Sequence, residues 1–185
     1  KNLIKLVSIA YVDGLYYKPR TDFKHLREHA EGLVCLSACL AGELPQAILR
    51  GDMQAADEIV ARYKALFGDD YYIEIQDHNI RDQKVVLPHL VALARKHGVK
   101  IVATNDVHYL NKHDATAQKV LQCISFRTTM SPTEMDENAP DLPPVSDGVD
   151  DTGYFPTKEF YLKSGDEMAE LFPNLGDALT NTLEV

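Results

Sequence analysis

Short apolar runs alternate with longer amphipathic stretches along this chain, and this alternation constrains the fold more than any other feature. Strands that alternate with helices indicate βα units around a parallel sheet. The sequence therefore predicts an α/β fold, as an open sheet or as part of a barrel. The expected strands lie at about 33–38, 71–77 and 100–106, and the expected helices between them at about 44–50, 53–67 and 82–97.

Side chains that bind metals or move protons follow the expected strands. Cys39, His78, Asp106 and His108 all lie at or just after a predicted strand end. Reactive groups of parallel α/β folds gather at this edge of the sheet. In "KIVATNDVHYL" (100–110), Asp106 and His108 are two residues apart and would share one face of a strand.

A thiol, a carboxylate and an imidazole are typical metal ligands. The alternative is structural: Asp106 and His108 would bond neighbouring loops, and Cys39 would be a small buried residue. These residues by themselves leave both interpretations open.

The second expected strand has a polar face. Glu74, Gln76 and His78 alternate along it and should point the same way. Three polar side chains on one face are unusual for a buried strand. We expect this face to be open to solvent or to line a pocket.

Charge and composition exclude several classes of protein. The chain has 185 residues and a net charge of −9, which excludes a strongly basic surface for nucleic-acid phosphates. Seven acids and no Lys or Arg lie within 128–157, and 130–156 also holds five prolines, so we predict an irregular acidic surface loop there. No apolar run approaches the roughly 18 residues of a membrane helix. Three cysteines without a CxxC pair favour a reducing, cytoplasmic setting.

Five segments in order are more specific than any of these signals alone: "KNLIKLVSIAYVDGLYYKPR", "EGLVCLSACLAGE", "YYIEIQDH", "VATNDVHYL" and "EFYLKSGDEMAELFP". Together they resemble the PHP (polymerase and histidinol phosphatase) domain of bacterial DNA polymerase III alpha subunits, which is a distorted, TIM-like β/α barrel. The resemblance implies that residues 1–185 are the C-terminal portion of such a domain. The family's N-terminal His-x-His motif, its further ligands and the polymerase domains are not within the chain.

The resemblance also implies a chemistry. It maps Cys39, Asp106 and His108 onto ligands of a cluster of divalent metal ions, which would be zinc, manganese or magnesium. Such metals activate water and neutralise phosphoryl charge, as a phosphoesterase, a 3′–5′ proofreading exonuclease or a pyrophosphatase requires. Three ligands cannot build the family's three-metal site, so we expect the chain alone to be inactive. Glu74, Gln76 and His78 remain candidate pocket-lining residues.

The implied parent is a DNA-directed DNA polymerase of the cytoplasm, a nucleotidyltransferase of DNA replication. Its partners would be DNA, deoxynucleotides, an exonuclease subunit and other replisome subunits, with no membrane. The rival interpretation is non-catalytic. In members with degenerate sites, the domain is a scaffold that docks the separate exonuclease subunit.

Overall fold

A parallel sheet of three strands lies at the centre of the computed structural model, which describes residues 1–130 and 155–185. The strands are β1 (Cys35–Leu36), β2 (Tyr71–Ile75) and β3 (Lys100–Ala103), in the order β1-β2-β3. Cys35 is paired with Tyr71 at one side of β2, and Ile75 is paired with Ala103 at the other. The predicted α/β class is confirmed at this level.

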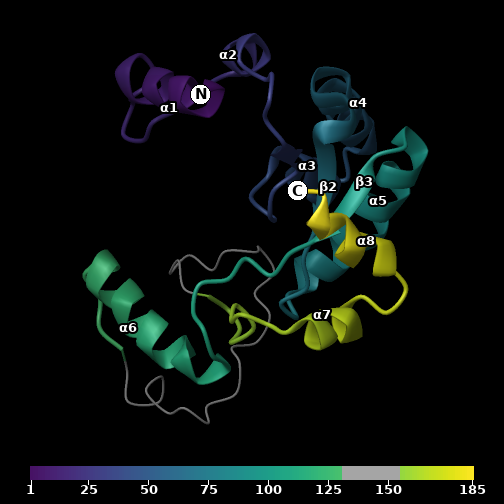
Figure 1. Cartoon of the computed structure of the whole chain (residues 1–185). Coiled ribbons are helices and arrows are strands. Elements are labelled where there is room, and N and C mark those ends of the chain that lie inside the picture. The colour runs from purple at the N-terminus through teal and green to yellow at the C-terminus, as the bar shows by residue number, and fades with distance from the viewer. Residues whose placement is uncertain (131–154) are drawn as a thin grey trace.

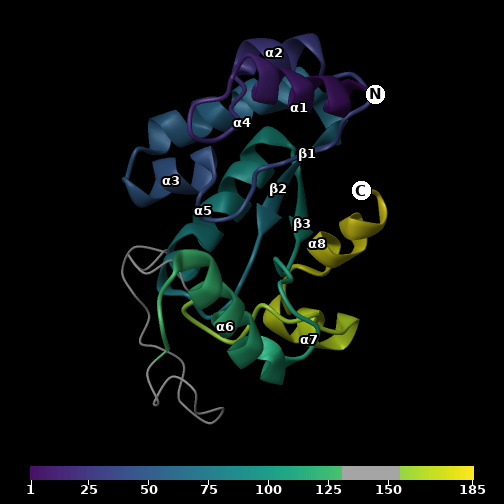
Figure 2. The ribbon, with the colours of Figure 1, turned by 90° about the vertical axis from the view of Figure 1, so that its left-hand side faces the viewer.

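Helices in the two crossovers cover the sheet (Figures 1 and 2). α3 (Glu43–Leu49) and α4 (Met53–Phe67) connect β1 to β2, and α5 (Arg81–His97) connects β2 to β3. The three helices pack on one another, and α4 and α5 pack on β2. Ile73 and Ile75 of β2 are fully buried in the resulting apolar core.

Local signals explain where these helices begin and end. Asp52 precedes α4, and its carboxylate accepts a hydrogen bond from the Ala55 amide at 2.9 Å, which satisfies a donor that the first helical turn leaves free. α5 ends at Gly98, whose φ of +60° is the left-handed conformation that glycine adopts without a Cβ clash. The expected helices at 53–67 and 82–97 are therefore confirmed.

The C-terminal helices cover the outer edge of the sheet. α7 (Gly165–Leu171) is followed by α8 (Gly176–Thr180) and by a 3-10 turn, η4 (Asn181–Leu183). α8 and η4 contact β3, and Asn181 donates from Nδ2 to the carbonyl of Ile101 at 2.9 Å. This cover protects an edge strand that would otherwise offer unpaired backbone groups.

Three other helices lie around this core: α1 (Asn2–Val12), α2 (Phe23–Glu28) and α6 (Ala115–Phe126). In α1 only Leu6 is buried, while Ile4 and Val12 are exposed. Ile124 of α6 is also exposed. Within 1–130 and 155–185, two further 3-10 turns are η1 (Gly68–Asp70), before β2, and η2 (Lys112–Asp114), before α6.

The strands are shorter than predicted. β1 covers 35–36 within the expected 33–38, β2 ends at Ile75 and β3 ends at Ala103. The third strand, expected to reach residue 106, ends at Ala103, and Asp106 has a φ of +40°, outside the range of strand residues. Beyond the sheet, Tyr161 and Tyr109 form an isolated parallel bridge.

Most of the acidic loop predicted at 130–156 lies outside the described residues. Among residues 1–130 and 155–185, none of the helices combines the length and the apolar character that a membrane crossing needs.

Candidate metal-binding site

Polar side chains meet where β2 and β3 end. The Glu74 carboxylate accepts hydrogen bonds from Gln76 Nε2 at 2.9 Å and from Thr104 Oγ1 at 2.5 Å. The Glu74 amide donates to Ser37 Oγ, just after β1, at 2.9 Å. Glu74 therefore connects the chain segments that follow all three strands.

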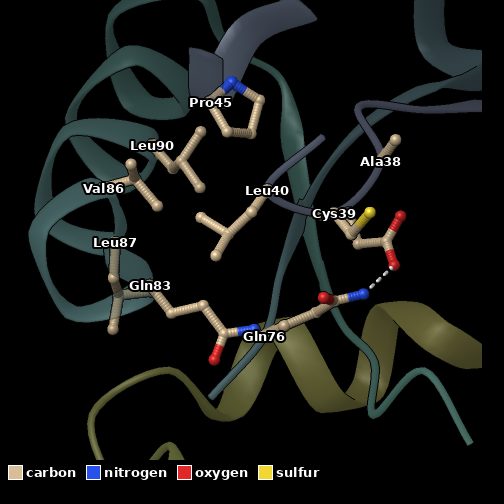
Figure 3. A pocket seen from close by; sticks show the side chains of 10 residues that line it. Ala38, Cys39, Leu40, Pro45, Gln76, Gln83, Val86, Leu87 and Leu90 are labelled. Carbon is tan, nitrogen blue, oxygen red and sulfur yellow. Dashed lines mark hydrogen bonds between the residues drawn. The ribbon is translucent and has the colours of Figure 1, made fainter. Parts of the chain in front are cut away.

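A small pocket beside this network contains Cys39 (Figure 3). Cys39 and Gln76 lie on one side of it, the apolar side chains of α5 lie on the other, and Leu40 lies between them. Its volume of about 10 Å³ leaves room for roughly one water molecule. The lining residues are Ala38, Cys39, Leu40, Pro45, Glu74, Gln76, Gln83, Val86, Leu87 and Leu90.

Asp106 and His108 lie on the loop after β3, not on a strand. The left-handed backbone of Asp106 brings its carboxylate to His108, with 3.4 Å between Asp106 Oδ1 and His108 Nε2. Both side chains are partly exposed, at 42% and 36%. The two side chains are thus neighbours that solvent can reach, although strand alternation is not what brings them together.

Aromatic rings border the His108 imidazole. The ring of Phe155 lies 4.4 Å from it, centroid to centroid, and the ring of Phe160 lies 5.9 Å from it in an edge-on orientation. The His108 amide donates to the carbonyl of Phe160 at 2.8 Å. Residues far along the chain therefore fix both the backbone and the ring of His108.

His78 has a different environment from the other candidates. It is fully buried, and it is not among the residues that line the pocket with Glu74 and Gln76. Gln83 Nε2 donates to Nδ1 of His78 at 2.7 Å, so Nε2 of the neutral ring donates to the carbonyl of Asn105 at 3.0 Å. Burial lowers the pKa of His78, against the opposing effect of the bond to Asn105. A neutral, fully bonded histidine supports the loop.

The three ligands predicted by resemblance are only partly assembled. Asp106 and His108 are adjacent, but no group of three or more His, Cys, Asp or Glu within 1–130 and 155–185 is arranged to hold a metal ion. Cys39 therefore does not complete such a group with them. The donor types suit zinc, but the described residues alone do not form a site.

Sequence reasoning missed the residues that hold the Asp106 loop. Asn105 is buried, and its Nδ2 donates to the carbonyls of Glu159 at 3.0 Å and Tyr161 at 2.7 Å. Thr157 is buried as well, and its hydroxyl donates to the carbonyl of His78 at 2.8 Å. One signal was present: the polar run Thr104-Asn105-Asp106 ends an apolar strand and is typical of a turn.

Comparison with known proteins shows to which family the chain is similar. Residues 1–78 match the PHP domain family. The whole chain is 44% identical to a DNA polymerase III subunit alpha of Treponema pallidum, 42% identical to one of Borreliella burgdorferi and 40% identical to one of Thermus aquaticus. It spans 14%, 15% and 14% of their lengths, respectively.

These matches, together with the parallel sheet and its crossovers, identify the chain as PHP domain sequence. The particular kind of PHP domain is the one found in DNA polymerase III alpha subunits.

Proposed function

We propose that this chain is a piece of a bacterial replicative DNA polymerase and forms the C-terminal portion of its PHP domain. The observation that carries the proposal is identity of 40% to 44% over the entire chain to three DNA polymerase III alpha subunits. In the whole protein, the three parallel strands would be part of a distorted β/α barrel. The activity of that protein would be primer extension in the cytoplasm, on DNA and deoxynucleotides and with exonuclease and other replisome subunits as partners.

We propose that this chain contributes Cys39, Asp106 and His108 to a metal site that residues outside this chain complete. A thiolate, a carboxylate and an imidazole would suit zinc, whereas manganese or magnesium would draw mainly on the carboxylate and on water. The adjacency of Asp106 and His108 supports this assignment. We derive no hydrolytic step for these 185 residues, because the described part offers no group of three donors.

A structural role is the second candidate, and the same finding favours it. Without a group of three donors among the described residues, this piece would act as a scaffold on which a separate exonuclease subunit docks. The two candidates differ in one measurable property. Only the phosphoesterase requires His108 to bind a metal ion.

The test uses the full-length polymerase, with primer extension and metal-dependent 3′–5′ cleavage measured on the same preparation. We expect the wild-type protein to extend primers, and the absence of extension would refute the parent assignment. His108→Ala should abolish cleavage and lower the bound metal while sparing extension, because the lost imidazole belongs to the PHP domain and not to the polymerase domains.

The matched control is His113→Ala, since His113 is 76% exposed and lies five residues further along the chain. Both variants must show the melting profile of the wild type, because losing a ligand can unfold a metal-dependent domain. A well-folded His108→Ala protein that keeps full cleavage, with copurifying exonuclease excluded, would leave the scaffold role as the better account.

A further inference from the structure

The backbone of Asp106 is the least expected feature of the candidate site. Its φ of +40° lies in the left-handed region, which is uncommon for a residue with a side chain, although Asp tolerates it better than most. Such conformations persist only where the surrounding structure over-determines them, and they gather at functional sites. The contacts on either side of Asp106 therefore indicate what holds the Asp106–His108 loop in this conformation.

Asn105 and His108, on either side of Asp106, are anchored to one distant segment, Thr157–Lys163, which we call the strap. Before Asp106, the two amide hydrogens of Asn105 Nδ2 are donated to the carbonyls of Glu159 and Tyr161. After it, the amide of His108 donates to the carbonyl of Phe160. Three consecutive carbonyls of the strap thus hold residues 105 and 108, and Asp106 has little freedom between them.

The strap is itself held firmly. The side chain of Lys163 is only 3% exposed, and its Nζ donates to the Glu159 carbonyl at 2.5 Å and pairs with the Glu159 carboxylate at 3.1 Å. At the other end, Thr157 donates to the carbonyl of His78. Lys163 thus holds the Glu159 carbonyl that receives Asn105, and its Nζ also donates to Asn105 Oδ1 at 3.4 Å.

We propose that Asn105 is a positioning residue: its amide ties the Asp106–His108 loop to the strap and keeps the two side chains turned toward each other. This role rests on the proposed function, which makes Asp106 and His108 metal ligands. Asn105 would touch neither metal nor substrate. Partners behind metal ligands typically change metal affinity by about 10- to 100-fold when they are mutated.

Asn105→Asp is the sharpest variant because it preserves size and shape. It replaces Nδ2, which donates to two carbonyls, with an oxygen that can only accept, so the same carbonyls would face a carboxylate. Asn174→Asp is the matched control, since Asn174 is exposed on the turn between α7 and α8. Both changes add one negative charge, and only the first removes the two bonds that Nδ2 donates to the strap. The oxygen that accepts from Lys163 Nζ is kept in Asp.

The experiment is hydrogen–deuterium exchange, read by mass spectrometry of peptides, on the full-length polymerase. Asn105→Asp should speed exchange in the peptides that cover 104–110 and 157–163 and leave α5 unchanged. Asn174→Asp should leave the exchange of the peptides covering 104–110 and 157–163 unchanged. Unchanged exchange in 104–110 would overturn the inference, and so would faster exchange throughout α5 with a lower melting temperature, because Asn105 would then be merely structural.

Metal affinity is the second readout, measured by titrating zinc into the metal-free polymerase. Asn105→Asp should weaken zinc binding by about 10- to 100-fold, with primer extension retained. If the wild-type PHP domain binds no zinc, the proposed metal role fails, and the exchange result still decides whether Asn105 positions the loop. If Asn105→Asp does not fold, Thr157→Val decides by the same exchange pattern, because it removes the hydrogen bond from the strap to His78 and the 3.4 Å bond that Thr157 Oγ1 accepts from the Glu159 amide.

Discussion

The imidazole of His78 and the ring of Phe160 stack on each other, with 4.0 Å between their centroids and 20° between their planes. One ring follows β2 and the other belongs to the strap, so this contact joins segments 82 residues apart. Both side chains are buried. An aromatic pair in this arrangement contributes about 0.5–1.5 kcal/mol beyond the area that it buries.

Phe160→Ala should therefore lower the free energy of unfolding by about 3–5 kcal/mol, the usual cost of deleting a buried aromatic ring. Denaturant unfolding of the chain, followed by circular dichroism, measures this change. Phe126→Ala is the control, because the Phe126 side chain is half exposed on α6 and its loss should cost clearly less. Equal costs for the two variants would mean that Phe160 is not part of the packed interior.

The start of α7 provides a second test of local energetics. Ser164 and Glu167 bond reciprocally: Ser164 Oγ accepts from the Glu167 amide at 3.3 Å, and Glu167 Oε2 accepts from the Ser164 amide at 2.8 Å. Ser164→Ala should lower the free energy of unfolding by about 0.5–2 kcal/mol, since the helix loses its cap. Ser8→Ala, at an exposed position inside α1, should be neutral or slightly stabilising because Ala favours helices. The same denaturant titration distinguishes them, and a Ser164→Ala protein as stable as the control would contradict the cap.

The sequence predicted α4 and α5 well because their signals are local. Apolar periodicity, Asp52 before α4 and Gly98 at the end of α5 act within a few residues of the helix they define. The strand ends were predicted less well. The strand expected at 100–106 ends at Ala103, although the Thr104 amide still donates to the Ile75 carbonyl at 3.0 Å. The polar run that begins at Thr104 marks this end, whereas the prediction carried the strand on to Asp106.

The candidate site shows where sequence reasoning reaches its limit. Asp106 and His108 could be selected from their residue types and their place after a strand. Asn105 could not, because its partners Glu159 and Tyr161 lie more than 50 residues away, beyond the acidic segment. A single sequence carries no signal for such a long-range pairing, and the strap has little regular structure of its own.

Cys35 allows a prediction about reactivity. Burial raises the pKa of its thiol to about 11, whereas an unfolded cysteine has a pKa of about 8.5. At about pH 8, roughly one Cys35 in a thousand would then be a thiolate, which is the reactive form. Iodoacetamide should label Cys35 slowly in the native chain and rapidly in denaturant, as followed by mass spectrometry of the peptide that contains it. Rapid labelling under native conditions would show that this thiol is not shielded.

His78 provides a prediction about pH. Its pKa in the folded protein is lowered by burial, below the value of about 6.5 expected when the chain is unfolded. As the pH falls below about 6.5, His78 binds a proton in the unfolded state but stays neutral in the folded state. The free energy of unfolding therefore decreases. Above about 6.5 both states are neutral at this position, and the contribution of His78 no longer varies with pH.

His78→Gln isolates this contribution. The variant should be less stable at neutral pH, because the ring contact with Phe160 is lost, but its stability should fall less steeply than that of the wild type between about pH 6.5 and pH 5. His113→Gln removes an exposed histidine and should keep the wild-type slope. The measurement is the free energy of unfolding from denaturant titrations at a series of pH values. If His78→Gln follows the wild-type slope throughout, His78 does not titrate differently in the folded and unfolded states, and the loss of stability in acid has another source.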